Sequence, residues 1–237
     1  QIQEKDAEYL NKKKVAAHLE AGLRGPVKGL IEPLYVTEDA EACDALLDPL
    51  DYHEKREILP GITVSFTDQG HIIGSAAALV EIKDGSQSLR IVFSGDRGRD
   101  RQPILRAPEP YPACDVLLTE STYGNRSHPS VDEMRTLEAD LVHEAVARGG
   151  KLIVPAFSVG RTQNVLYHLC ELRQSGAIPE IPVFVDSPLS NEVTRIYREH
   201  PECFDAETLK KFRERFNPFD FPGLHYIEKV QDSMRLN

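Results

Sequence analysis

The spacing of hydrophobic and polar positions changes twice along the chain, first near residue 55 and again near residue 125. Before residue 55 the sequence predicts two helices. One covers residues 2–22, which are rich in Glu, Lys and Ala, and it is expected to be amphipathic. The other is short and covers residues 37–47, whose first turn is acidic. The first part of the chain is therefore expected to be helical.

Short runs with strand character follow. They cover residues 56–59, 61–68, 75–82 and 88–94. Turns that contain glycine separate them, and Asp84-Gly85 is a typical hairpin signal, so the runs predict four consecutive antiparallel strands. Residues 115–120 predict one more strand, which is short and apolar as a buried strand would be.

After residue 125, helical and strand patterns alternate. The expected helices cover residues 131–150, 160–176 and 188–200, and the expected strands cover residues 151–157 and 181–186. Such alternation is typical of βαβ units around a parallel sheet. The predicted fold class is therefore α/β, with a strand-rich domain in residues 1–124 and an alternating domain in residues 125–237.

Composition and charge exclude several classes of protein. The 237 residues are 41% hydrophobic and 28% charged, a balance that is typical of a globular protein with a core. No apolar run approaches the roughly 18–20 residues of a membrane helix and no secretory leader is visible, so we expect no membrane partner. The net charge of −10 argues against indiscriminate binding to nucleic acid.

The cysteines indicate the cellular compartment. Cys43, Cys114, Cys170 and Cys203 are widely scattered and form no CxxC motif. This spacing favours free thiols over a disulfide framework or a thiolate zinc site. We therefore expect a reducing, cytoplasmic location.

Two residues at strand ends could bind a metal ion. His71 lies in a loop between Gly70 and Gly74, and Asp96 follows an apolar strand on a glycine turn. Taken singly, each has an ordinary explanation as a structural loop histidine or a turn aspartate. Together, an imidazole and a carboxylate from adjacent strand ends would suit zinc, which accepts nitrogen and oxygen ligands.

A third candidate is Glu120, which leaves the apolar strand predicted at residues 115–120. One interpretation is an acid that caps a helix or stabilises a turn. The other is a carboxylate that orients a metal-bound histidine. The sequence by itself leaves both interpretations open.

Two strand-to-helix turns could bind an anion. Residues 155–163 run from a strand through small residues into a helix that opens with Arg161. Free backbone N–H groups and the helix dipole favour an anion there, and an arginine can donate two hydrogen bonds to a phosphate. Alternatively, Ser158 caps the helix, and Ser187 with Pro188 starts the next one without any ligand. Ligands of parallel sheets gather at the carboxyl ends of strands, where both turns are expected.

Four arginines follow Asp96 closely: Arg97, Arg99, Arg101 and Arg106. One interpretation is a solvated surface loop. The other is that this basic cluster, placed beside a metal site, holds a phosphate chain.

Motifs between residues 70 and 188 resemble, in their order and spacing, the metallo-β-lactamase-fold RNA nucleases that carry an inserted β-CASP domain. The resemblance rests on the segments GHIIGSA, FSGD, TESTYGNR, PAFSVGRTQ and DSP. It implies a partial metallo-β-lactamase αββα sandwich in residues 1–124. It also implies a β-CASP domain with a parallel αβα sheet in residues 125–237.

The resemblance assigns roles to the candidate residues. His71 would ligate one zinc ion, and Asp96 would bridge two. Glu120 matches an acidic residue that lies near the metal centre and supports a catalytic histidine. Ser158 and Arg161 match a turn that handles phosphate, and Ser187 is expected beside it.

The function implied by the resemblance is hydrolysis of RNA phosphodiester bonds in RNA processing or decay, as an endonuclease, a 5′→3′ exonuclease or both. A complete active site of this family holds two zinc ions. The expected partner is single-stranded RNA, and a homodimer is one option for the assembly.

The chain also departs from the family pattern. It contains neither the HxHxDH motif that begins this family's fold nor the histidine motifs of its C-terminal part. We therefore expect a central part of a longer protein, inactive by itself. Two alternatives stay open: a non-catalytic RNA-binding or scaffolding member, and a small-molecule hydrolase of the same superfold. Residues 123–188 argue against the latter, which needs no β-CASP insertion.

Overall fold

The computed structural model describes residues 2–127, 129–214 and 216–236. It divides into two compact units, Gln1–Pro49 and Leu50–Asn237. The domain boundary predicted near residue 125 lies inside the second unit, and it stays a prediction.

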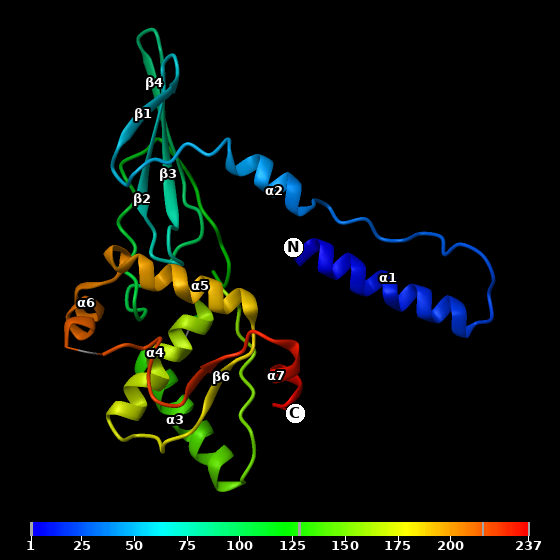
Figure 1. Cartoon of the computed structure of the whole chain (residues 1–237). Helices are drawn as coiled ribbons and strands as arrows, with labels where there is room; N and C mark the ends of the chain where they lie inside the picture. The colour runs from blue at the N-terminus through cyan, green and yellow to red at the C-terminus, as the bar shows by residue number, and fades with distance from the viewer. Residues whose placement is uncertain (1, 128, 215, 237) are drawn as a thin grey trace. The chain divides into compact units, whose positions relative to one another are not determined.

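The first unit contains the two helices that the sequence predicts. Helix α1 covers Ile2–Glu20 and helix α2 covers Thr37–Asp44 (Figure 1). The chain between them is tied to α1 because the side chain of Asn11 exchanges two hydrogen bonds of 2.8 Å with the backbone of Ile31. Ala7 is buried, but Tyr9, Leu10, Val15 and Leu19 are all more than a third exposed, so the described side chains of α1 do not form the buried apolar face of the expected amphipathic helix.

The second unit begins with a five-stranded sheet in the order β1-β2-β3-β4-β5 (Figure 1). The strands are β1 (Lys55–Leu59), β2 (Ile62–Asp68), β3 (Ala76–Asp84), β4 (Gln87–Phe93) and β5 (Val116–Leu118). The first four pair antiparallel in sequence order, which confirms the prediction, and β5 pairs parallel to β4. Ala77, Leu79 and Val92 form a small buried core on this sheet.

Glycine makes the two tight hairpins of the sheet possible. Leu59 pairs with Ile62 across a loop that contains Gly61 (φ +79°). Asp84 pairs with Gln87 across a loop that contains Gly85 (φ +57°). Both backbone conformations are costly for other residues, so these glycines fix where the strands turn.

Strand β5 differs from expectation in its burial. Its side chains are 43–48% exposed, although the sequence predicts a buried strand. The reason is its place in the sheet, because β5 is the edge strand and is paired with β4 on one side.

Helices and short strands follow, and they alternate less regularly than predicted because no strand among the described residues separates α3 from α4. The elements are α3 (Val131–Ala147), α4 (Arg161–Gln174), β6 (Val183–Val185), α5 (Pro188–Glu199), a 3-10 helix (Pro201–Cys203), α6 (Ala206–Arg213), β7 (Leu224–Tyr226) and α7 (Val230–Met234). Strands β6 and β7 pair parallel, which confirms the expected direction of the sheet. None of the helices in the described part of the chain has both the length and the apolar character needed to cross a bilayer.

The strand predicted at residues 151–157 is wrong. This segment forms no ladder with any described residue, and Ile153 and Phe157 are each 84% exposed. An apolar, β-branched sequence favours an extended backbone, but a strand also needs a neighbour to accept its hydrogen bonds.

The main core joins the loop after β4 to the helical part. Its largest buried side chains include Tyr197, Phe204 and Phe219. Ile104 and Leu105, from the loop that follows β4, are buried in the same core. The backbone N–H of Asp205 donates to the carbonyl of Ile104 at 2.8 Å. This shared core fixes the loop after β4 against the helical part of the unit.

Candidate functional site

His71 and Asp96 lie at the same end of the five-stranded sheet, each just after the last residues of a strand. His71 follows β2 and Asp96 follows β4, and both strands run antiparallel to β3, which separates them. The distance from His71 Nε2 to Asp96 Oδ2 is 3.8 Å, and the two side chains are 44% and 72% exposed. The structure therefore brings the two predicted metal ligands together at a surface that a metal ion and a substrate can reach.

Close packing of two loops sets this geometry. The backbone N–H of Gly98 donates to the carbonyl of Gln69 at 2.8 Å. Gly98 lies so close to the neighbouring loop that a Cβ atom at this position would lie 2.8 Å from the backbone nitrogen of His71. The backbone N–H of His71 itself donates to Ser75 Oγ at 2.9 Å. The glycine allows the loops that carry His71 and Asp96 to touch.

Glu120 lies beside the same loops. Its Oε1 accepts a 2.9 Å hydrogen bond from the backbone N–H of Arg97, the residue after Asp96. This hydrogen bond is the main cause that lowers the pKa of Glu120, with smaller contributions from hydrogen bonds to Thr122 and from the charge of His71. Glu120 is therefore ionised at neutral pH, and it holds the backbone next to Asp96.

The donor types of this site fit zinc. An imidazole nitrogen and a carboxylate oxygen are both usual zinc ligands, and a zinc site has about four positions. Among residues 2–127, 129–214 and 216–236, no group of three or more His, Cys, Asp or Glu side chains could hold a metal ion. His71 and Asp96 can therefore supply part of a zinc site, and further ligands would have to complete it.

A second constellation forms where α4 and α5 begin. Gln163, fully buried in the first turn of α4, donates a 2.9 Å hydrogen bond to Thr194 of α5 and so ties the two helices together. As a result Ser158 Oγ and Ser187 Oγ are 3.4 Å apart. Ser187 caps α5, and the two helix N-termini lie side by side. Two adjacent helix N-termini with serine hydroxyl groups beside them favour an anion.

Arg161 is the first residue of α4, directly after Gly160. Gly160 has φ +78° and packs against the His71 loop, because a Cβ atom there would lie 3.0 Å from Cγ2 of Ile72. The predicted phosphate turn and the predicted metal ligands are therefore neighbours in the structure.

The basic cluster after Asp96 does not act as one surface. Arg97 donates to Gln69 Oε1 at 2.7 Å and to the carbonyl of Glu109 at 2.9 Å. Arg106 forms an ion pair of 2.8 Å with Asp68. These two arginines brace the fold, so phosphate binding stays a prediction for the other two, Arg99 and Arg101.

Asp68 and Gln69 are the residues that sequence reasoning missed. Both are buried at the end of β2, directly before the loop that carries His71, and both bind an arginine from the loop after β4. The available signal was two polar residues in succession between an apolar strand and a Gly-His pair.

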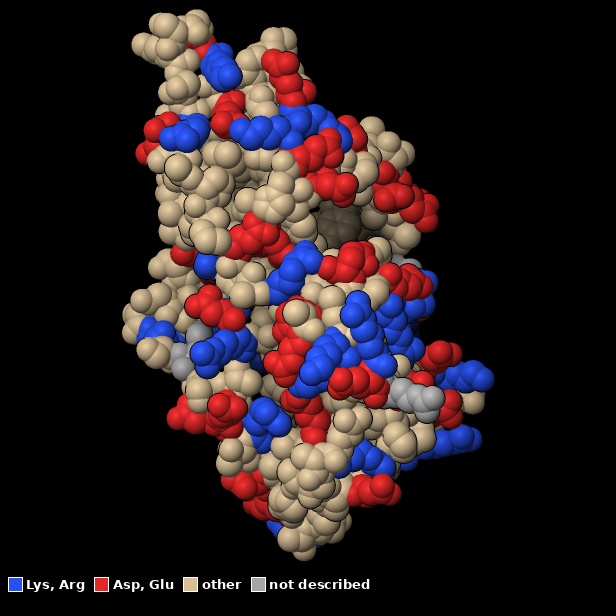
Figure 2. Space-filling model, turned by 90° about the vertical axis from the view of Figure 1, so that its left-hand side faces the viewer, with Lys and Arg blue, Asp and Glu red and all other residues tan. Residues whose placement is uncertain are grey.

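Charge on the surface is mixed. Figure 2 shows one face on which Lys and Arg lie among Asp and Glu, without a broad basic area. Together with the net charge of −10, this arrangement favours recognition of an anion by a local site over recognition by a wide positive surface.

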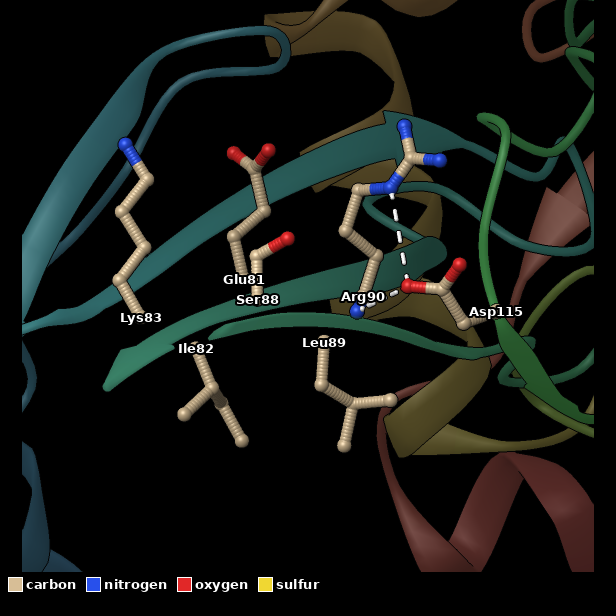
Figure 3. A pocket seen from close by; sticks show the side chains of 7 residues that line it. All are labelled: Glu81, Ile82, Lys83, Ser88, Leu89, Arg90 and Asp115. Atoms are coloured by element: carbon tan, nitrogen blue, oxygen red, sulfur yellow. Dashed lines mark hydrogen bonds and ion pairs between the residues drawn. The ribbon is translucent and has the colours of Figure 1, made fainter. Parts of the chain in front are cut away.

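A shallow hollow lies at the opposite end of β3 from His71. Glu81, Lys83, Arg90 and Asp115 are among the residues that line it (Figure 3). The backbone N–H of Arg90 donates to Asp115 Oδ2 at 2.8 Å, and the Arg90 Nε atom lies 3.9 Å from the same oxygen. The hollow is therefore separate from the candidate site, and its Arg90 and Asp115 side chains pair with each other.

Comparison with known proteins adds independent information. The model of the Beta-Casp domain matches residues 162–237. A ribonuclease of Thermus thermophilus is 31% identical over 219 residues, which are 92% of this chain and 49% of the ribonuclease. A transcription termination factor of Methanosarcina mazei is 35% identical over 175 residues, or 72% of this chain and 27% of the factor.

An endoribonuclease of Saccharomyces cerevisiae is 30% identical over 208 residues, which cover 85% of this chain and 26% of the yeast protein. The chain thus spans about half the length of the bacterial relative and about a quarter of the other two. The similarity to all three extends well beyond the segment that the domain model matches.

Proposed function

Because the chain belongs to the β-CASP family of metallo-β-lactamase-fold RNA nucleases, we propose that it contributes to a zinc-dependent hydrolase of RNA phosphodiester bonds. The observation that carries this proposal is the convergence of two sites. The His71–Asp96 pair lies next to the turn at residues 158–161, where Gly160 packs on Ile72. A metal-binding pair beside a phosphate-binding turn would suit metal-assisted hydrolysis of a phosphodiester.

His71 and Asp96 would be ligands of the zinc site in this proposal. A bound zinc ion supplies a water of lowered pKa and an electrophile for the phosphoryl oxygen. Glu120 accepts the backbone hydrogen bond of Arg97 and so fixes the position of Asp96. We assign Glu120 a positioning role on this ground.

The phosphate would bind at the paired helix N-termini. Ser158 and Ser187 present hydroxyl groups 3.4 Å apart, and Arg161 adds an exposed guanidinium at the start of α4. Hydrogen bonds from these groups would hold the RNA backbone while the neighbouring site acts on it. Endonuclease or 5′→3′ exonuclease action, a homodimer and a cytoplasmic location stay predictions.

The proposal is tested by removing the metal. Incubation of the intact protein with a chelator is expected to abolish cleavage of an end-labelled single-stranded RNA, because the attacking water is then no longer activated. Added zinc is expected to restore cleavage, measured on denaturing gels. Cleavage that persists after chelation would contradict the proposal. RNA binding without cleavage in zinc would instead support the non-catalytic alternative.

Replacing Arg161 by Ala is expected to weaken the binding of single-stranded RNA about tenfold, or roughly 1.4 kcal/mol, because a charged hydrogen bond to phosphate is lost. Zinc content should stay unchanged, since Arg161 is not a ligand. Fluorescence anisotropy and metal analysis measure the two quantities. Arg148→Ala is the control, because Arg148 forms an exposed ion pair with Glu144 at the end of α3. Equal affinities of the Arg161 variant and the original protein would refute the role.

A further inference from the structure

Three arginines near the candidate site, Arg99, Arg101 and Arg161, have no carboxylate partner among the described residues, and two of them, Arg99 and Arg161, interact with each other. Arg99 is the third residue after Asp96, and Arg161 opens helix α4. Neither arginine forms an ion pair with any described side chain. Two other arginines of the loop after β4 bind within the protein. Arg97 donates to Gln69, and Arg106 donates to Asp68.

The two unpaired groups influence each other. Partial burial lowers the pKa of Arg99, and the positive charge of Arg161 lowers it further. Two like charges close together raise the free energy of the folded protein unless an anion lies between or beside them. No described carboxylate lies within ion-pair distance of either arginine, so an external anion bound between them would relieve this repulsion.

Both arginines flank the loop that carries His71. Arg99 directly follows Gly98, whose backbone touches that of His71. Arg161 directly follows Gly160, which packs on the side chain of Ile72. Arg99 is also half-buried, with Nη1 4.0 Å from Sδ of Met134 on α3, so its side chain is directed by packing.

We propose that Arg99 and Arg161 bind the same backbone phosphate of an RNA strand, beside the His71–Asp96 pair. Arg99 is then a phosphate-binding residue that the motifs do not identify. One guanidinium comes from the loop after β4 and the other from α4, so together they can contact two sides of one phosphate. This inference rests on the proposed function, because it takes RNA as the ligand.

The test measures how salt affects RNA binding by the full chain. The probe is a labelled oligouridylate of about 12 nucleotides, within the length that a groove for single strands covers. Arg99→Gln is expected to weaken binding about tenfold at low salt. It should also reduce the slope of log K against log salt concentration by about 0.7, the value for one phosphate contact on a single strand. Arg148→Gln is the charge-matched control and should change neither quantity.

A double-variant cycle tests whether the two arginines share one phosphate. Arg99→Gln combined with Arg161→Gln is expected to lose less affinity than the product of the single losses, because either loss alone already disrupts the shared contact. Fully independent effects would overturn the shared phosphate. An unchanged salt slope in Arg99→Gln would overturn the role of Arg99 while leaving the proposed function intact.

Two further variants separate charge from packing. Met134→Leu removes the sulfur contact and keeps the charge, so it should bind RNA with the original slope. Arg99→Lys keeps one charge without the forked donors, and it should retain the slope but lose part of the affinity. If Arg99→Gln does not fold, Arg99→Lys decides, and undiminished affinity overturns the proposal. Absence of any salt-dependent RNA binding by the unaltered chain would overturn the proposed function as well.

Discussion

Asp96→Asn in the intact protein is expected to reduce RNA cleavage at least about a thousandfold, which corresponds to roughly 4 kcal/mol of activation free energy. The amide has the size of the carboxylate but lacks its charge, so zinc binding at this position is expected to fail. The fold should remain, because the Asp96 side chain is 72% exposed and its pairing with His71 is a surface contact. Cleavage rate, zinc content and the thermal unfolding midpoint are the three measurements.

Asp100→Asn is the matched control for this experiment. Asp100 is an exposed carboxylate in the same loop, four positions further along the chain. The Asp100→Asn substitution removes one negative charge from the loop that also carries Asp96. This variant should therefore cleave RNA at the original rate. A normal cleavage rate in Asp96→Asn would show that the metal assignment is wrong. Equal losses in both variants would point to a general effect of loop charge.

Gly98→Ala is expected to lower the free energy of unfolding by about 1–3 kcal/mol and to impair RNA cleavage at the same time. The added methyl group would meet the backbone of Gly70 and His71, with 2.8 Å to the nitrogen of His71. Backbone atoms cannot rotate away as a flexible side chain can, so the two loops must move apart. Movement of these loops separates the His71 and Asp96 side chains, which lie 3.8 Å from each other.

Gly150→Ala provides the comparison. The nearest atom to a Cβ at Gly150 is the carbonyl oxygen of Ala145 at 3.9 Å, an ordinary contact. This variant should be neutral or slightly stabilising, because alanine restricts the unfolded chain. Denaturant unfolding and RNA cleavage measure both variants. A Gly98 variant as stable and active as the Gly150 variant would show that the close approach of the two loops is not needed.

The sequence was informative where local rules decide the structure. Glycines that must adopt positive φ mark the two hairpins at Gly61 and Gly85, so strand order and direction could be predicted. Strand ends are the natural place for ligands. For this reason His71 and Asp96, 25 positions apart in the chain, were expected together and lie 3.8 Å apart.

The two serines lie close together for a different reason. Ser158 and Ser187 are separated by 29 positions, and each lies between an apolar segment and a helix. Their hydroxyl groups meet because Gln163 and Thr194 tie the two helices together from inside. Both turns were expected at the same end of a sheet, but the strand expected before Ser158 does not form, and the buried amide of Gln163 was not visible in any pattern.

Sequence patterns failed where the outcome depends on distant partners. Arg97 and Arg106 are indistinguishable from Arg99 in the sequence, but they differ in what surrounds them. Arg97 donates a hydrogen bond to Gln69, and Arg106 donates one to Asp68. Periodicity also cannot show whether a neighbouring strand exists, and residues 151–157 accordingly form no ladder in the described structure.

The two bracing arginines have a consequence for the thermodynamics of binding. Arg97 fixes the start of the loop through Gln69, and Arg106 fixes its end through Asp68, with Arg99 between them. A cation on a free loop loses conformational entropy each time it captures a ligand. In the segment between Arg97 and Arg106, most of this conformational entropy has already been lost on folding. The segment between the two braces is therefore preorganised, and RNA would bind to a guanidinium that is already held near its bound position.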